Sequence, residues 1–282
     1  MNSKKITPCC CDPEQDTGRP ALACLSEAEM LAVQAHVESH IGAVTWIIHE
    51  VVSEGIHLDI LVVEPAEKRP YFTLLTMGMS ALPMSIPKAL NLSPYTELML
   101  YLPRQWIFYE PAPGAPGAGA DGTTPPGSKN KTQNMATPKP DPADERNFWP
   151  IRWLKMLARL PSTSDTWLGY GHSIPAGGSV AANTALSGFV LSPPLEGEEF
   201  FTLSLNNGKK IHFWNLVPVY QEEMDYKLKN GADALFELFD RYQVSPIIDI
   251  SRPNVITCNL NPEHSEFPAT GNENSYECTR RN

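Results

Sequence analysis

The sequence lacks the features that mark several large classes of protein. All six cysteines lie outside residues 25–257, so no disulfide framework is expected through the body of the fold. No run approaches the roughly 18 apolar residues of a membrane-spanning helix. Lys4 and Lys5 precede Thr-Pro-Cys-Cys-Cys, with no apolar core of a secretory signal after them. A reducing cytoplasm, and no membrane association, are therefore expected.

The charge balance also narrows the choice of partners. The chain carries 32 acidic and 22 basic residues, which gives a formal net charge of −10. Such a charge disfavours nonspecific attraction to nucleic acids and to anionic membranes. A basic protein partner is favoured.

The composition divides the chain into one domain, a tail at each end and one insertion within the domain. Residues 1–20 are aperiodic and are expected to form a disordered tail, in which Cys9-Cys10-Cys11 lacks the ligand spacing of a zinc site. Residues 21–257 form the domain, interrupted at 110–147 by a segment rich in Pro, Gly and Ala that lacks the apolar side chains to offset its ordering entropy. Residues 258–282 are polar and are expected to form a flexible tail.

Periodicity and turn residues predict the regular elements of the first half. Ser26 and Glu29 have the spacing of a capping box, which predicts a helix at 26–40. Residues 43–52 are rich in β-branched side chains and predict one long strand, and 56–84 contains two more. The order Thr-Met-Gly-Met-Ser at 76–80 closes that stretch. For 95–102 periodicity alone leaves helix and strand open.

The second half alternates predicted helices and strands. Pro150 suits the first turn of a helix that Pro161 would end, and its basic stripe could meet an acidic partner or solvent. Asn206-Asn207-Gly208 predicts a hairpin between strands at 200–205 and 211–220. Two helices separated by Asn230-Gly231 follow, at 221–229 and 232–242.

Several separated segments resemble the suppressor of fused family, and its bacterial branch in particular. They are Thr-Met-Gly-Met-Ser at 76–80, Trp-Pro-x-x-x-Leu-x-x-Leu-Ala-Arg at 149–159, Trp-Leu-Gly-Tyr-Gly-His at 167–172 and Pro-Val-Tyr-x-x-Glu-Met-x-Tyr at 218–226. The resemblance spans about 56–255 and favours a strand at 95–102. Ala81 stands where animal members tend to have an acidic residue, so their partners are not carried over.

The resemblance implies an α+β fold, a mixed and mostly antiparallel sheet flanked by helices in a single-domain sandwich. It also implies a non-enzymatic binding protein without cofactor or metal. Animal members bind transcription factors, and the bacterial branch includes immunity proteins that neutralise polymorphic toxins. A bacterial immunity or regulatory protein with a protein partner, possibly a toxin domain, is therefore expected, and the oligomeric state is left open.

Candidate partner contacts come from the late helices and from the Gly-x-His segment. The acidic side chains suit the positive ends of helices and would also meet a basic partner. The alternative is an enzyme that uses His172 with nearby carboxylates, for which His57 and Asp59 are further candidates, although no nucleophile elbow or metal-ligand spacing surrounds His172. The contact candidates are Glu222, Glu223, Asp225, Asp233, Glu237, Tyr170 and His172.

Overall fold

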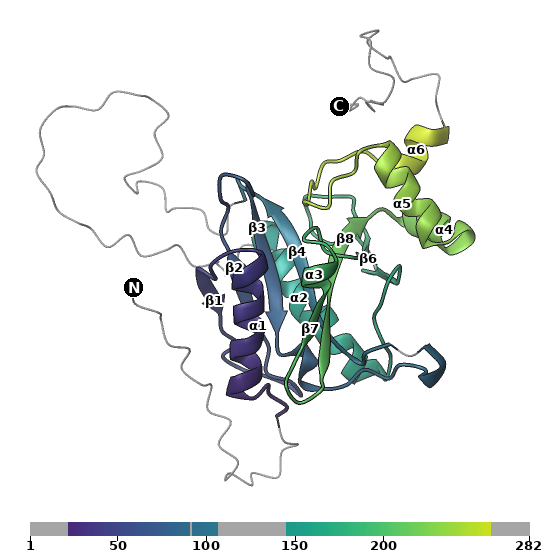
Figure 1. Ribbon diagram of the computed structural model, residues 1–282. Coiled ribbons are helices and arrows are strands. Elements are labelled where there is room, and N and C mark those ends of the chain that lie inside the picture. The colour runs from purple at the N-terminus through teal and green to yellow at the C-terminus, as the bar shows by residue number, and fades with distance from the viewer. Residues whose placement is uncertain (1–21, 91, 107–144, 261–282) are drawn as a thin grey trace, which may run out of the picture.

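Eight strands form one open sheet in the computed structural model of the chain, which describes residues 22–90, 92–106 and 145–260 (Figure 1). The strand order is β1-β2-β3-β4-β8-β6-β5, and β7 pairs with β8. The pair β4–β8 is parallel, and every other strand pair in these ranges is antiparallel. The strands are β1 Trp46–Ile48, β2 Asp59–Val63, β3 Tyr71–Met77, β4 Tyr95–Pro103, β5 Ser173–Pro175, β6 Gly188–Ser192, β7 Thr202–Ser204 and β8 Lys210–Val219.

Helices cover both faces of this sheet. Side chains of β2 alternate between two cores, so that Ile60 packs with Trp149 of α2 and Leu61 packs with Val33 of α1 on the opposite face. A strand buried on both faces reads as one continuous apolar run, which is why 60–63 shows no polar alternation. The helices are α1 Glu27–His40, α2 Glu145–Ser164, α3 Glu198–Phe201, α4 Gln221–Asn230, α5 Ala232–Arg241 and α6 Val255–Leu260, with short 3-10 turns η1 Met79–Ala81 and η2 Lys88–Leu90.

A third apolar cluster joins α4, α5 and α6 to one end of the sheet. Val190 of β6 and Val219 of β8 pack there against Leu235 and Phe239 of α5. In Figure 1 these three helices project beyond the end of the sheet, away from α1. The outer faces of α4 and α5 are therefore exposed over a small core of their own.

The predicted α+β fold, with a mostly antiparallel sheet flanked by helices, is confirmed. The capping box at Ser26 and Glu29 is present, with the Glu29 amide 3.3 Å from Ser26 Oγ and the Ser26 amide 3.0 Å from Glu29 Oε2. The hairpin at 206–208 is present between β7 and β8. Residues 95–102 are a strand.

Several predicted boundaries are wrong. The strand expected at 43–52 is only the three residues of β1, because the chain turns at His49 to meet Asp59. Helix α2 continues past Pro161, which is buried, and the hydroxyl groups of Ser162 and Thr163 donate to the Arg159 carbonyl.

The ends of the domain also differ from the prediction. Residues 145–147, assigned to the insertion, are the first residues of α2, and residues 258–260, assigned to the tail, belong to α6. The rest of the insertion and of the two tails lies outside the described residues.

The Thr-Met-Gly-Met-Ser turn closes over a fully buried carboxylate, that of Glu97 on β4. Its two oxygens accept hydrogen bonds from five donors, which are the hydroxyl of Thr76, the hydroxyl of Ser80 and the amides of Gly78, Met79 and Ser80. Burial raises the pKa of Glu97, and the hydrogen bonds from the Ser80 and Thr76 hydroxyls and from the Ser80 and Gly78 amides oppose that shift. The residues of this turn therefore supply the hydrogen-bond donors that the buried Glu97 carboxylate requires.

Gly78 also determines how closely the 76–80 turn approaches the backbone of His57. Its φ of 137° is strained for other residues, and a Cβ there would stand 2.1 Å from the His57 carbonyl oxygen. Only glycine allows the turn to approach β2 so closely. The backbone of His57 is thereby held beside the buried Glu97.

Acid should destabilise the fold through histidines that are buried in their neutral form. His36 Nε2 lies 2.8 Å from the Phe200 carbonyl, its ring stacks on Phe200 and Phe213, and burial lowers its pKa. A folded-state pKa below the unfolded value means that the unfolded chain binds the proton more tightly. Stability should therefore fall as pH drops from the ordinary histidine value through the folded pKa.

Urea unfolding across a pH series measures this effect. His36→Gln keeps an amide donor for the Phe200 carbonyl and should flatten the slope in that window. The exposed neighbour His40→Gln is the matched control. An unchanged slope in His36→Gln would contradict the prediction.

Candidate functional site

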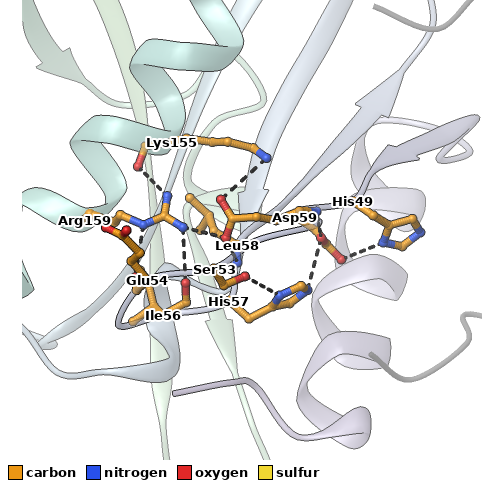
Figure 2. Close-up of polar contacts among 10 residues, drawn as sticks. His49, Ser53, Glu54, Ile56, His57, Leu58, Asp59, Lys155 and Arg159 are labelled. Atoms are coloured by element: carbon orange, nitrogen blue, oxygen red, sulfur yellow. Dashed lines mark hydrogen bonds and ion pairs between the residues drawn. The ribbon is translucent and has the colours of Figure 1, made fainter. Parts of the chain in front are cut away.

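The loop between β1 and β2, residues 49–58, folds back on Asp59 at the start of β2 (Figure 2). His49 Nδ1 lies 3.0 Å from one carboxylate oxygen of Asp59, and the Glu50 amide donates to the other at 3.0 Å. His57 Nε2 lies 3.3 Å from that second oxygen, and the side chains of His57 and Asp59 are 7% and 5% exposed. Two imidazoles and one backbone amide therefore surround a single buried carboxylate.

The same loop is tied to α2 through Glu50. Arg159 Nη2 lies 2.5 Å from Glu50 Oε2, and Lys155 Nζ lies 3.7 Å from Oε1. Glu50 Oε2 also accepts from the Leu58 amide at 3.3 Å. The Arg159 guanidinium reaches the carbonyls of Glu54 and Ile56 as well, so one side chain fixes three points of the loop.

The basic stripe predicted on α2 is thus satisfied within the chain. Lys155 and Arg159 pair with Glu50, while Arg152 lies 3.0 Å from Glu145 and donates to the Val180 carbonyl. Burial lowers the pKa of Lys155, and the carboxylates of Glu50 and Asp59 oppose that shift. The charges of this stripe therefore have partners within the chain.

One serine extends the network toward solvent. Ser53 Oγ lies 2.9 Å from His57 Nδ1, so Ser53, His57 and Asp59 form a continuous chain of polar contacts. Ser53 is half-buried, while Val51 and Val52 beside it are 96% and 80% exposed. The loop is held at its base and presents an open tip.

The loop is braced from its other side by the segment that precedes α1. The Ala23 amide donates to the Gly55 carbonyl and the His57 amide donates to the Ala23 carbonyl, both at 2.9 Å. These bonds belong to a single bridge between Ala23 and Ile56. The backbone around Ser53 and His57 is therefore fixed by main-chain as well as side-chain contacts.

The predicted contact residues lie elsewhere, on α4, α5 and the adjoining loop. Tyr170 and Asp233 are brought together, with the Tyr170 hydroxyl 2.6 Å from Asp233 Oδ1, a contact that with burial raises the pKa of Tyr170 to about 12. Glu222, Asp225 and Glu237 are exposed on the same pair of helices. Four of the five predicted carboxylates are therefore available to a partner.

Glu223 is not, and the expectation that it contacts a partner is wrong. Its side chain is fully buried and forms a two-point ion pair with Arg252, while the amides of Tyr220 and Val255 donate to it. Glu223 is the third residue of α4, at a position that faces the small core formed by α4, α5 and α6. Several acidic residues stand together at the start of α4, so the sequence pattern did not distinguish the buried carboxylate from the exposed ones.

His172 stands in a third environment. Its Nδ1 lies 3.2 Å from the Trp167 carbonyl, its ring packs edge-on against Trp167, and burial lowers its pKa. The histidine and carboxylates named for the enzyme alternative are thus spread over separate groups of contacts. Of these candidates, only His57 and Asp59 converge.

Two patterns were overlooked in the sequence. Ser-x-x-x-His-x-Asp at 53–59 is short enough to suggest a local polar relay. His-x-x-x-His at 36–40 has the spacing of a zinc motif, but His36 faces the Phe200 carbonyl and His40 Nδ1 faces the His36 carbonyl. Within the described ranges, no three His, Cys, Asp or Glu side chains are grouped so as to hold a metal ion.

The fold and the buried turn define a suppressor of fused domain, as the comparisons show. The family model for suppressor of fused protein matches residues 54–253. The chain belongs to the suppressor of fused family.

Two solved structures share the fold. A suppressor of fused homologue from Neisseria gonorrhoeae FA 1090 has 14% identity and a TM-score of 0.52, over 80% of this chain and 96% of that one. A chain in a Sufu–Fu complex has 12% identity and a TM-score of 0.54, over 84% and 95%. A search of curated proteins finds no match.

Among the described residues, no helix has the length and apolar character needed to cross a membrane. Cys24 and Cys258, the two cysteines within the described ranges, both take part in disulfide bonds. Disulfides are rare in a reducing cytoplasm, so the expected cytoplasmic location has this observation against it.

Proposed function

We propose that this chain acts by binding another protein and not by catalysis. The observation that carries the proposal is that four carboxylates on α4 and α5 are exposed, with the Tyr170 hydroxyl donating to one of them; this set, here called the acidic face, is Glu222, Asp225, Asp233 and Glu237. It sits on helices that project from the sheet (Figure 1). The family supports this function, because one structure that shares the fold is a Sufu–Fu complex.

The chemistry of the acidic face favours a basic partner. Tyr170 is 46% exposed and its ring lies 5.6 Å from that of Phe236, so aromatic surface adjoins the carboxylates. Aromatic side chains are typical anchors of interfaces, and complementary charge raises association rates more than affinity. In a bacterial cell such a partner could be the toxin domain that an immunity protein neutralises, or the target of a regulatory protein.

The enzyme alternative is less well supported. His172 contacts Trp167, Glu223 is paired with Arg252, and Glu222 accepts from Asn254. Among the described residues, no contact joins these groups so that one could act as base while another acts as acid. A catalytic role for His172 would therefore need a different arrangement of these side chains.

Charge reversal on the acidic face tests the proposal. The partner is first recovered by pull-down from native lysate and identified by mass spectrometry. Glu222→Lys, Asp225→Lys and Glu237→Lys together should slow its association by about tenfold or more at low salt and flatten the salt dependence. Asp233 is left intact because it accepts from Tyr170. Thermal stability should change little, since exposed charges contribute little to folding.

Glu38→Lys, Glu67→Lys and Glu199→Lys together form the matched control, because they change the net charge equally and these exposed side chains lie on α1, on the β2–β3 turn and on α3. Equal slowing in the control would show an effect of net charge and not of this face. Recovery of no stoichiometric protein partner, together with a turnover abolished by His172→Ala, would replace binding by the enzyme alternative.

A further inference from the structure

We infer that Ser53 is an activated nucleophile, a covalent modification site for acyl and phosphonyl electrophiles. The inference rests on the order Ser53, His57, Asp59 and on the loop that holds it, and is independent of the acidic face. In this order a carboxylate orients an imidazole, and the imidazole accepts the proton of a hydroxyl. Figure 2 shows His57 placed between the other two side chains.

Hydrogen-bond chemistry assigns the protons. His57 Nε2 forms no hydrogen bond within the described residues, but it faces an oxygen of the Asp59 carboxylate, which is an acceptor, and this contact favours the tautomer with the hydrogen on Nε2. This leaves the lone pair of Nδ1 directed at Ser53 Oγ, 2.9 Å away. The hydroxyl therefore donates to the imidazole, which is the arrangement needed for proton removal during attack. The 3.3 Å separation of Nε2 and Asp59 is long for a hydrogen bond and acts as an electrostatic contact.

The surroundings preorganise this group. Asp59 is kept in place by His49 and by the Glu50 amide, and the backbone of His57 is fixed by Ala23 and Gly78. A nucleophile and base held on a rigid support lose less entropy when they react. Ser53 itself is half-buried in a loop whose tip is open to solvent, so an electrophile can reach it.

The reaction with an ester can be written in full. Ser53 Oγ forms a bond to the carbonyl carbon, its proton moves to His57 Nδ1, and the bond from that carbon to the leaving oxygen breaks as the proton passes to the leaving group. The product is an ester of Ser53 and a free alcohol. With a fluorophosphonate, the Oγ–P bond forms, the P–F bond breaks, and fluoride leaves with the proton.

We expect one modification per chain and no turnover, which agrees with a binding protein. The guanidinium that contacts this loop, that of Arg159, is committed to Glu50 and to the carbonyls of Glu54, Ile56 and Lys155. It is therefore not free to stabilise an oxyanion in either step, so we expect reaction with activated electrophiles but no hydrolysis of the product. Modification of Ser53 would break its contact with His57 and alter the loop that carries Val51 and Val52.

The chain supplies its own control. Ser39 Oγ also lies 2.9 Å from a histidine nitrogen, Nδ1 of His40. That nitrogen, however, faces the His36 carbonyl at 2.9 Å, an oxygen that can only accept, so Nδ1 carries the hydrogen and cannot act as a base. The Ser39 hydroxyl donates to the same carbonyl. Ser39 is exposed, which favours its labelling on access alone.

The experiment treats the full chain with a fluorophosphonate probe and maps the labelled serines by mass spectrometry over time. General-base activation contributes about 10²–10⁴-fold, so Ser53 should be labelled about a hundredfold faster than Ser39. Ser53→Ala should abolish that label, and His57→Gln should reduce it to the rate of Ser39 if the variant stays folded by circular dichroism. If His57→Gln unfolds, the ratio of the labelling rates of Ser53 and Ser39 in the unmodified chain still tests the inference. Equal rates at Ser53 and Ser39, or no label at Ser53, would overturn the inference.

Discussion

Replacing Glu97 by alanine should lower the free energy of unfolding by roughly 3–5 kcal/mol. The side chain is fully buried and accepts from five donors of the 76–80 turn. Each buried donor left without a partner costs about 1–3 kcal/mol, although water entering the space would satisfy some of them. The midpoint of urea unfolding measures the loss.

Two variants calibrate this result. Glu97→Gln keeps one acceptor oxygen and should lose less than Glu97→Ala. Glu38→Ala removes an exposed carboxylate and should change stability by no more than about 0.5 kcal/mol. A loss below about 1 kcal/mol in Glu97→Ala would mean that the turn does not depend on its buried acceptor.

Replacing Arg252 by alanine should cost a similar amount, roughly 3–5 kcal/mol, because it leaves a buried carboxylate without its counter-charge. Arg252 forms two bonds with Glu223, donates to the Pro218 carbonyl, and lies over the rings of Tyr220 and Phe239. Loss of these contacts would loosen α4–α6 from the sheet. Differential hydrogen exchange would place the loss in these helices.

The double variant Glu223→Leu with Arg252→Met separates the charge from the packing. Two apolar side chains of similar size replace the pair without leaving either charge unpaired, so much of the stability should return. Arg241→Met is the control, since its side chain is exposed at the end of α5. If Arg252→Ala and Arg241→Met lose equal stability, the buried pair does not hold these helices.

Local patterns were sufficient where neighbouring residues decide the structure. The capping box of Ser26 and Glu29, the hairpin at 206–208 and the helices around Gly231 all depend on residues within four positions of one another. The helix at 26–40 and the late strands could therefore be predicted from the sequence. The strand at 95–102 needed the family resemblance, because an apolar run buried on both faces has no distinguishing period.

Contacts between distant residues account for what could not be predicted. Lys155 and Arg159 looked like a solvated stripe because their partner, Glu50, is separated from Arg159 by 109 positions. Residues 49–52 continue a β-branched pattern, yet Asp59 draws them out of the strand. Glu223 resembles its exposed neighbours in type, and only its pairing with Arg252 distinguishes it.

The site formed by Ser53, His57 and Asp59 depends on both local sequence and distant contacts. Ser53, His57 and Asp59 fall within seven residues, so their types were visible in sequence. Their convergence depends on the return of the chain at 49–58 and on the close approach permitted by Gly78. The carboxylates of α4 and α5 could be named from the sequence because they lie on two adjacent predicted helices, although the sequence did not show that Glu223 turns inward.

The parallel pairing of β4 with β8 has a consequence for how the chain reaches its fold. Thr96 and His212, joined across this pair, are 116 positions apart, and the insertion lies between them. The entropy of closing so long a loop grows only with the logarithm of its length, so deleting 107–144 would change it by roughly a few tenths of a kcal/mol. The length of this segment therefore has little effect on stability through loop closure. The rate of folding is instead limited by bringing the two halves of the sheet together.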